Sequence, residues 1–175
     1  MNSSESNEPK STDQEETVEE QLEKNQELFP IVGIGASAGG LAAFTELLGH
    51  LPTDIGMGFV LIQHLDPENK SLLTEILARI TQMLVIEVVD GMTVEPNHVY
   101  VIPPNTKMIL AQGRLRLSPR EKTGGTYMPV DVFFRSSAVE LGSKTIGIVL
   151  SGADGDGAQG LKALPSGRRN YLCSV

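Results

Sequence analysis

Three short apolar runs constrain the fold of this chain more than any other feature, because none of them alternates with polar residues. They cover residues 29–34, 57–62 and 145–150. Strands without such alternation are typical of a parallel sheet that is covered on both faces. Apolar residues at helical spacing follow the first two runs, which predicts the order strand, helix, strand, helix. We therefore predict an α/β fold in three layers, with a mainly parallel, doubly wound sheet and helices on both faces.

Spacing and turn residues predict the remaining elements. The stretch between the second and third apolar runs contains short β segments, and the turn at 111–114 predicts a small β hairpin over 108–117. The predicted helices share apolar positions at helical spacing and cover residues 39–50, 69–81 and 130–141, with a further helix that begins at Ala158.

The composition divides the chain into three parts. Residues 1–28 hold nine acidic residues, two lysines and few apolar residues, which predicts a disordered acidic tail. Residues 29–163 form the predicted α/β domain. Residues 164–175 are polar and continue no pattern, so we expect an atypical tail and a domain that is incomplete at its C-terminus.

Charge and composition argue against several classes of function. The net charge of −8 lies mainly in the acidic tail, so the domain offers no basic face for a nucleic acid. No apolar run reaches about 18 residues, which argues against membrane insertion. The single cysteine, Cys173, forms no internal disulfide, as fits a reducing cytoplasm. No His, Cys and carboxylate cluster has metal-ligand spacing, and we expect neither metal nor cofactor.

A short polar motif follows each of the three apolar runs. These motifs contain Ser37 in residues 35–39, His64 in residues 63–66, and Asp154 and Asp156 in residues 152–157. In an open α/β sheet, ligands bind at the carboxyl ends of the strands, where these side chains meet. The first motif also matches the Gly-x-Ser-x-Gly pattern of a nucleophile elbow. Together they predict a serine hydrolase.

Other interpretations of the same residues stay open. Ser37 could cap the following helix in a glycine-rich turn. Gly33, Gly35 and Gly39 also resemble a dinucleotide-binding turn, although the second apolar run ends in Gln63 and His64 and not in an acid. The Asp-Gly pairs at 152–157 are common in plain turns. The order Ser, His, Asp differs from that of α/β-hydrolases, which indicates another scaffold. His50 and His98 receive no role.

Five ordered segments carry a resemblance to a known family. They are residues 32–40, 63–65, 90–91 with 99–104, 130–136, and 149–158. The chain resembles the catalytic domain of the CheB-type chemotaxis protein-glutamate methylesterases, and most closely the domain found in esterase–methyltransferase hybrid sensor proteins. The resemblance implies Ser37 as nucleophile, His64 as general base and Asp156 as the triad aspartate, with Asp154 beside the triad and not catalytic.

The resemblance also implies a function and its partners. It implies hydrolysis of glutamate γ-methyl esters on the cytoplasmic helices of methylated receptors, in chemotactic phosphorelay signal transduction. A methyltransferase domain or protein is a further expected partner. Ala38 and Ala153 depart from the residues usual in the family near the oxyanion and substrate wall. The alternative is a non-catalytic module that docks a receptor or methyltransferase, or an inactive fragment of a hybrid signalling protein.

The resemblance further implies sheet elements beyond Ala163 that this sequence does not match. We therefore expect an unpaired sheet edge and a helix after Asp156 that lacks its packing partners. Since that helix and its loop hold Asp156, this aspartate is the triad member that we expect to be misplaced, with weak activity as the result.

Overall fold

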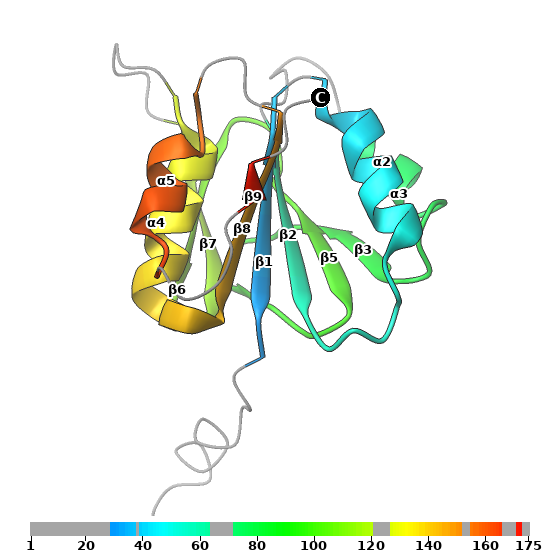
Figure 1. Cartoon of the computed structure of the whole chain (residues 1–175), viewed down its shortest axis with the longest axis horizontal. Helices are drawn as coiled ribbons and strands as arrows, with labels where there is room; N and C mark the ends of the chain where they lie inside the picture. The colour runs from blue at the N-terminus through cyan, green and yellow to red at the C-terminus, as the bar shows by residue number, and fades with distance from the viewer. Residues whose placement is uncertain are drawn as a thin grey trace, which may run out of the picture.

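The computed structural model describes residues 29–37, 39–63, 72–120, 127–151, 155–165 and 171–172. The acidic tail predicted over 1–28 lies outside them. Figure 1 shows the arrangement of the elements. In chain order they are β1 (Ile31–Ala36), α2 (Gly40–His50), β2 (Gly58–Gln63), α3 (Leu73–Leu77), β3 (Leu84–Glu87), β4 (Met92–Thr93), β5 (His98–Val101), β6 (Thr106–Ala111), β7 (Arg114–Pro119), α4 (Pro129–Leu141), the short 3₁₀ turn η1 (Gly142–Lys144), β8 (Thr145–Ser151), α5 (Ala158–Ala163) and β9 (Tyr171–Leu172).

The main sheet has the order β3-β5-β2-β1-β8-β9, and the paired strands run parallel. The chain starts at the central strand β1, moves outward through β2 toward β5 and β3, and returns on the other side of β1 as β8. Such a reversal opens a crevice at the carboxyl ends of the strands. The predicted doubly wound α/β sheet is therefore confirmed, and the end of β1 lies at its switch point.

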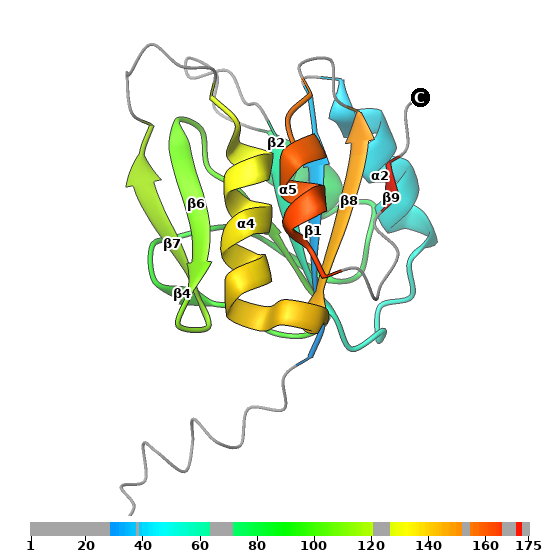
Figure 2. The same ribbon diagram turned by 60° about the vertical axis from the view of Figure 1, so that its left-hand side comes forward.

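Helices cover both faces of this sheet, as Figures 1 and 2 show. Alternate residues of β1 enter two separate cores. Val32 and Ile34 lie in the core beneath α2 and α3. Ile31 lies in the opposite core, together with Phe133 and Phe134 of α4. The three predicted layers are thus present. The small antiparallel sheet lies beside α4, on the face of the main sheet that α4 and α5 cover.

Glycines in β1 and β8 let α4 and α5 lie close to the sheet. A Cβ added to Gly33 would lie 2.7 Å from Cε1 of Phe134, and one added to Gly35 would lie 2.4 Å from Cγ1 of Val130. A Cβ added to Gly147 would lie 2.5 Å from Cδ1 of Leu164, the residue that follows α5. Gly33 is therefore a packing residue within β1 and is not part of a phosphate-binding turn.

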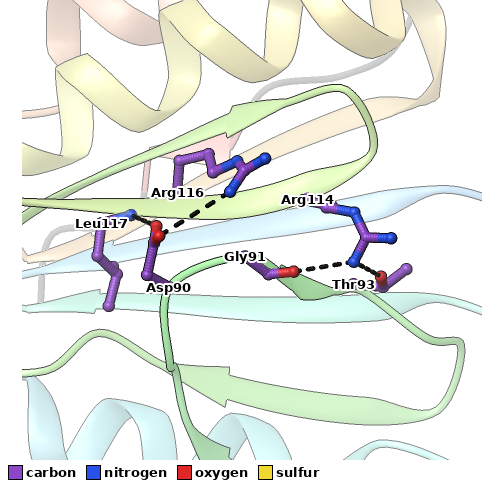
Figure 3. A network of polar contacts seen from close by, with 6 residues as sticks. All are labelled: Asp90, Gly91, Thr93, Arg114, Arg116 and Leu117. Atoms are coloured by element: carbon purple, nitrogen blue, oxygen red, sulfur yellow. Dashed lines mark hydrogen bonds and ion pairs between the residues drawn. The ribbon is translucent and has the colours of Figure 1, made fainter.

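The predicted hairpin is formed by β6 and β7, and β4 joins it as a third antiparallel strand. Figure 3 shows how the turn before β4 is tied to β7. Asp90 accepts a hydrogen bond from the backbone N–H of Leu117 at 2.8 Å. The Arg114 guanidinium donates to the carbonyl of Gly91 at 3.0 Å and to Oγ1 of Thr93 at 3.1 Å. These contacts fix the hairpin against the rest of the domain.

Helix α3 is shorter than the helix predicted over 69–81, of which residues 69–71 lie outside the described part. It ends at Leu77. The next turn is tighter, because the N–H of Arg79 donates to the carbonyl of Ile76 and that of Ile80 to the carbonyl of Leu77. A continued α-helix would place Ile80 on the same face as the buried Leu73 and Leu77. With the change in pitch, Ile80 is instead 40% exposed.

The expectation that the helix after Asp156 lacks packing partners is wrong. Helix α5 lies beside α4 in Figure 2 and contacts it along its length. Leu161 and Leu164 join the core that includes Phe134. The segment predicted as an atypical tail contributes β9, which pairs with β8 at Ile148 and Val149. The edge of the sheet is therefore paired at these positions.

The close approach of α4 to β1 makes a testable prediction. Gly33→Ala forces a methyl group against Phe134 and should lower the free energy of unfolding by about 1–3 kcal/mol. Gly49→Ala is the matched control, because its Cβ would find only an ordinary contact at 3.5 Å within helix α2. That control should raise the stability by about 0.4–1 kcal/mol. Urea unfolding of both variants tests this, and equal stabilities would contradict the packing account.

Candidate active site

The end of β1 presents Ser37 between two neighbouring strands. Ala36 lies opposite Gln63 of β2 and opposite Ser151 of β8, so Ser37 leaves the sheet at the centre of its carboxyl edge. The N–H of Gly40 donates to the carbonyl of Ser37 at 2.9 Å, which turns the chain into α2. The N-cap residue of α2 is Gly39, so Ser37 does not occupy the capping position.

Gln63 holds this turn from the side of β2. Its side-chain Nε2 donates a hydrogen bond to the carbonyl oxygen of Ser37 at 3.2 Å. Gln63 is only 8% exposed. A buried amide needs hydrogen-bond partners, and this one joins the ends of β1 and β2. The sequence interpretation gave Gln63 no role. The signal that could have indicated one is that Gln63 is a polar residue at the end of an otherwise apolar strand.

The structure does not describe every residue predicted for the site. His64 follows Gln63 in the sequence but lies outside the described residues, and so does Asp154. Ala38 and Ala153, the two departures from the family pattern, also lie outside them. The assignment of His64 as general base therefore stays a prediction.

Asp156 is buried and bound to the first turn of α4. It lies between Gly155 and Gly157, whose φ angles of +73° and +92° belong to the left-handed region that favours glycine. Its Oδ2 accepts a hydrogen bond from the N–H of Val130 at 3.0 Å, and its Oδ1 accepts one from the N–H of Asp131 at 2.9 Å. The first N–H groups of a helix have no partner within the helix, and the dipole there favours a negative charge. Asp156 therefore caps α4.

Asp131 makes the reciprocal contact. It is 7% exposed, and its Oδ1 accepts a hydrogen bond from the N–H of Gly160, in the first turn of α5, at 2.6 Å. A Cβ at Gly160 would lie 2.8 Å from Cβ of Phe134 and 2.9 Å from Cα of Asp131, so the two helices touch here. The first turn of α4 thus binds the carboxylate of Asp156, which lies just before α5. The first turn of α5 in return binds the carboxylate of Asp131, which belongs to α4. This exchange ties Asp156 and the first turn of α5 to α4.

The role of Asp156 in orienting His64 stays a prediction, because His64 lies outside the described residues. A carboxylate has the acceptor capacity for it: each oxygen has a second lone pair, so a carboxylate can bind two N–H groups of a helix and also accept a hydrogen bond from the N–H of an imidazole. Burial raises the pKa of Tyr127, the nearby positive charge of Arg120 lowers it, and the negative charge of Asp156 raises it. Tyr127 therefore lies within electrostatic range of Asp156.

Among the described residues, no three His, Cys, Asp or Glu side chains gather as they would around a metal ion. No helix of those ranges is long and apolar enough to cross a membrane.

A family model described as CheB methylesterase matches residues 32–170. The chain belongs to the CheB methylesterase family. The match continues past Ala163, where the sequence resemblance was expected to end. The crystal structure of the Thermotoga maritima CheB methylesterase catalytic domain matches with a TM-score of 0.70 and 28% identity, over 78% of this chain and 74% of that chain.

Two relatives support the membership. One from Leptospira interrogans is 31% identical over 137 residues, which are 78% of this chain and 71% of the relative. One from Myxococcus xanthus, named protein-glutamate methylesterase/protein-glutamine glutaminase 1, is 36% identical over 138 residues. Those residues are 77% of this chain but only 40% of the Myxococcus protein. The CheB methylesterase fold predicted from the sequence is thus confirmed.

The carboxylate exchange between the two helices can be tested at Asp131. Asp131→Ala leaves the N–H of Gly160 buried without its acceptor and should cost about 1–3 kcal/mol of stability. Asp131→Asn keeps an acceptor oxygen and should lose less. Asp54→Ala, at an exposed position, should change the stability by less than about 0.5 kcal/mol. Thermal unfolding measures all three, and an Asp131→Ala variant as stable as the Asp54→Ala control would contradict this account.

Proposed function

We propose that this chain is a protein-glutamate methylesterase that hydrolyses γ-methyl esters of glutamate side chains to glutamate and methanol. The observation that carries the proposal is the match of residues 32–170 to the CheB methylesterase family model. It is supported by Ser37 directly after the central strand β1, and by a buried Asp156 that binds the first turn of α4. The Myxococcus relative carries this activity in its name.

The proposed mechanism uses three side chains and no cofactor. Oγ of Ser37 attacks the ester carbonyl carbon while His64 takes the serine proton. The tetrahedral intermediate collapses, the C–O bond to the methoxy group breaks, and His64 passes the proton to the leaving methanol. Water then attacks the acyl-enzyme with His64 as base, which releases glutamate and restores Ser37. Asp156 orients His64 and stabilises its charged form.

The start of α2 supplies a place for the negative charge that develops on the ester oxygen. Ser37 lies just before this helix, and backbone N–H groups at a helix N-terminus attract an oxyanion. Each such donor is worth about 3 kcal/mol of the barrier in serine hydrolases. The bond from Gln63 to the carbonyl of Ser37 helps to hold the turn that aims these groups.

The proposed partners follow from this reaction. The substrate is a methylated receptor, modified on its cytoplasmic helices, and the site of action is the cytoplasm. A methyltransferase domain or protein is a further proposed partner, since the ester must be formed by a methyl transfer to a glutamate. The competing hypothesis, a non-catalytic docking module, predicts binding of the receptor without release of methanol.

The names of the relatives include a second activity, which the side chains proposed for the esterase could also perform. The Myxococcus protein is named a protein-glutamine glutaminase as well as a methylesterase. A γ-carboxamide presents the same carbonyl carbon to Ser37, and His64 would protonate ammonia in place of methanol. We propose glutamine deamidation as the second candidate, to be measured as ammonia release from the unmodified receptor.

The nucleophile assignment is tested by methanol release from a receptor fragment that carries labelled methyl esters. Ser37→Ala should reduce the release to the level without protein, because no other group forms the acyl-enzyme. Asp156→Asn should lower turnover by about 10³–10⁴-fold, since the orientation of the base is lost. Circular dichroism establishes that each variant remains folded.

Ser143→Ala is the matched control, because Ser143 is exposed in η1 at the opposite end of α4. It should release methanol at the rate of the unmodified protein. Methanol release by Ser37→Ala at that same rate would refute the nucleophile assignment. Receptor binding without any methanol release by the unmodified protein would favour the docking module instead.

A further inference from the structure

A small polar pocket lies beside the candidate active site. Among the described residues, those that line it are Gln63, Ile102, Pro103, Pro104, Asn105, Thr106, Arg120 and Tyr127. Of these eight, only Arg120 carries a charge at neutral pH. The described part of the pocket wall therefore has a positive character with no carboxylate to neutralise it, and it attracts anionic groups.

Arg120 is held in place by its surroundings although it is exposed. Its guanidinium carbon lies 4.4 Å from the centre of the Tyr127 ring, a cation–π contact. The hydroxyl of Tyr127 donates a hydrogen bond to the carbonyl of Thr106. The backbone N–H of Arg120 donates to the carbonyl of Asn105 at 2.9 Å, which fixes the end of the hairpin. The guanidinium is therefore positioned over the ring, and within the described part of the chain no acceptor binds its N–H groups.

One contact connects this pocket to the proposed nucleophile: Gln63 lines the pocket, and its amide binds the carbonyl of Ser37. Tyr127 also lines the pocket, and the negative charge of Asp156 is one of the causes that raise the pKa of its hydroxyl. A substrate bound at Ser37 thus has this pocket next to its reacting group. Apart from Gln63, which holds the turn at Ser37, the pocket residues named above have no part in the proposed mechanism, so they can recognise a neighbouring part of the substrate.

We propose that Arg120 binds a carboxylate of the substrate protein that lies close to the ester, so that the site prefers methyl esters in acidic surroundings. This inference rests on the proposed esterase function. A guanidinium presents N–H groups in a planar fork that matches a carboxylate. On a helical substrate, side chains three or four positions from the ester lie on the same face, about 5–6 Å away at their Cβ atoms. An acidic side chain there reaches Arg120 while the ester reaches Ser37.

The test compares two helical peptides that carry the same glutamate methyl ester. One has glutamates three and four positions to either side, and the other has glutamines there. For the unmodified protein, kcat/KM should be about fivefold higher for the acidic peptide, mainly through KM, as expected for a solvent-exposed ion pair. Arg120→Ala should bring this ratio close to one, whereas Arg120→Lys should keep part of it. Raising NaCl from about 0.1 M to about 1 M should also reduce the ratio.

Arg116→Ala is the matched control. Arg116 is an exposed arginine of β7 in the same hairpin, and its Nη1 lies 3.9 Å from Oδ2 of Asp90 (Figure 3). It is not among the described residues that line the pocket. This variant should keep the full preference for the acidic peptide. An Arg120→Ala variant that also keeps it would overturn the inference.

A second readout separates this inference from the proposed function. Hydrolysis of the glutamine-flanked peptide by the unmodified protein tests the esterase activity alone. If neither peptide is hydrolysed, the esterase proposal fails, and fluorescence anisotropy then measures the binding of both labelled peptides. Tighter binding of the acidic peptide that Arg120→Ala abolishes would support the inference, and equal binding of the two peptides would overturn it.

Discussion

The bond between the Asp156 carboxylate and the first turn of α4 is the contact on which the rest of the site depends. Val130 and Asp131 are buried, so their N–H groups would be costly to leave without acceptors. Asp156 supplies both acceptors, and in doing so it holds the segment just before α5 against α4. Asp131 returns the contact through Gly160. A single pair of carboxylates therefore joins a strand end and two helices.

Val130 connects this capping arrangement to the serine motif. A Cβ at Gly35 would lie 2.4 Å from Cγ1 of Val130, and one at Gly157 would lie 2.9 Å from the same atom. Gly35 comes two residues before Ser37, and Gly157 comes directly after Asp156. Both glycines therefore make room for the residue whose N–H binds the aspartate. The first glycine of the Gly-x-Ser-x-Gly motif thus has a packing role as well as a place in the turn, and it sets the distance between α4 and β1.

The sequence predicted the layers well because they follow from periodicity. The apolar runs at 57–62 and 145–150 correspond to β2 and β8, and the turn at 111–114 correctly indicated the hairpin. The bond of Asp131 to Gly160 could not be predicted this way, since it joins a side chain to a backbone group 29 positions away and leaves no periodic signal. The strand β9 could not be predicted for the same reason. It is short and lies in a polar segment, which predicted a tail, and it is a strand only because it pairs with β8.

For the site, the strand pattern predicted that Ser37 and Asp156 lie at one edge of the sheet, because parallel strands end together. The described residues place Ser37 directly after β1 and Asp156 against the first turn of α4, and the triad itself stays a prediction. The roles of Gln63 and Arg120 depend on contacts with Ser37 and Tyr127 that only the folded chain brings together. The expected misplacement of Asp156 relative to His64 stays a prediction, because His64 lies outside the described residues. Within them, α5 packs on α4 and Asp156 forms its bonds to α4.

The central claim is that Asp156, held by α4, supports a nucleophilic serine at the end of β1. Labelling by a fluorophosphonate, followed by mass spectrometry, tests it most directly, because this reagent reacts with an activated serine hydroxyl. The account predicts a single adduct on Ser37, formed far more slowly when Asp156 is replaced by asparagine in a protein that remains folded. Absence of an adduct on Ser37, or a rate that is unchanged in that variant, would contradict it.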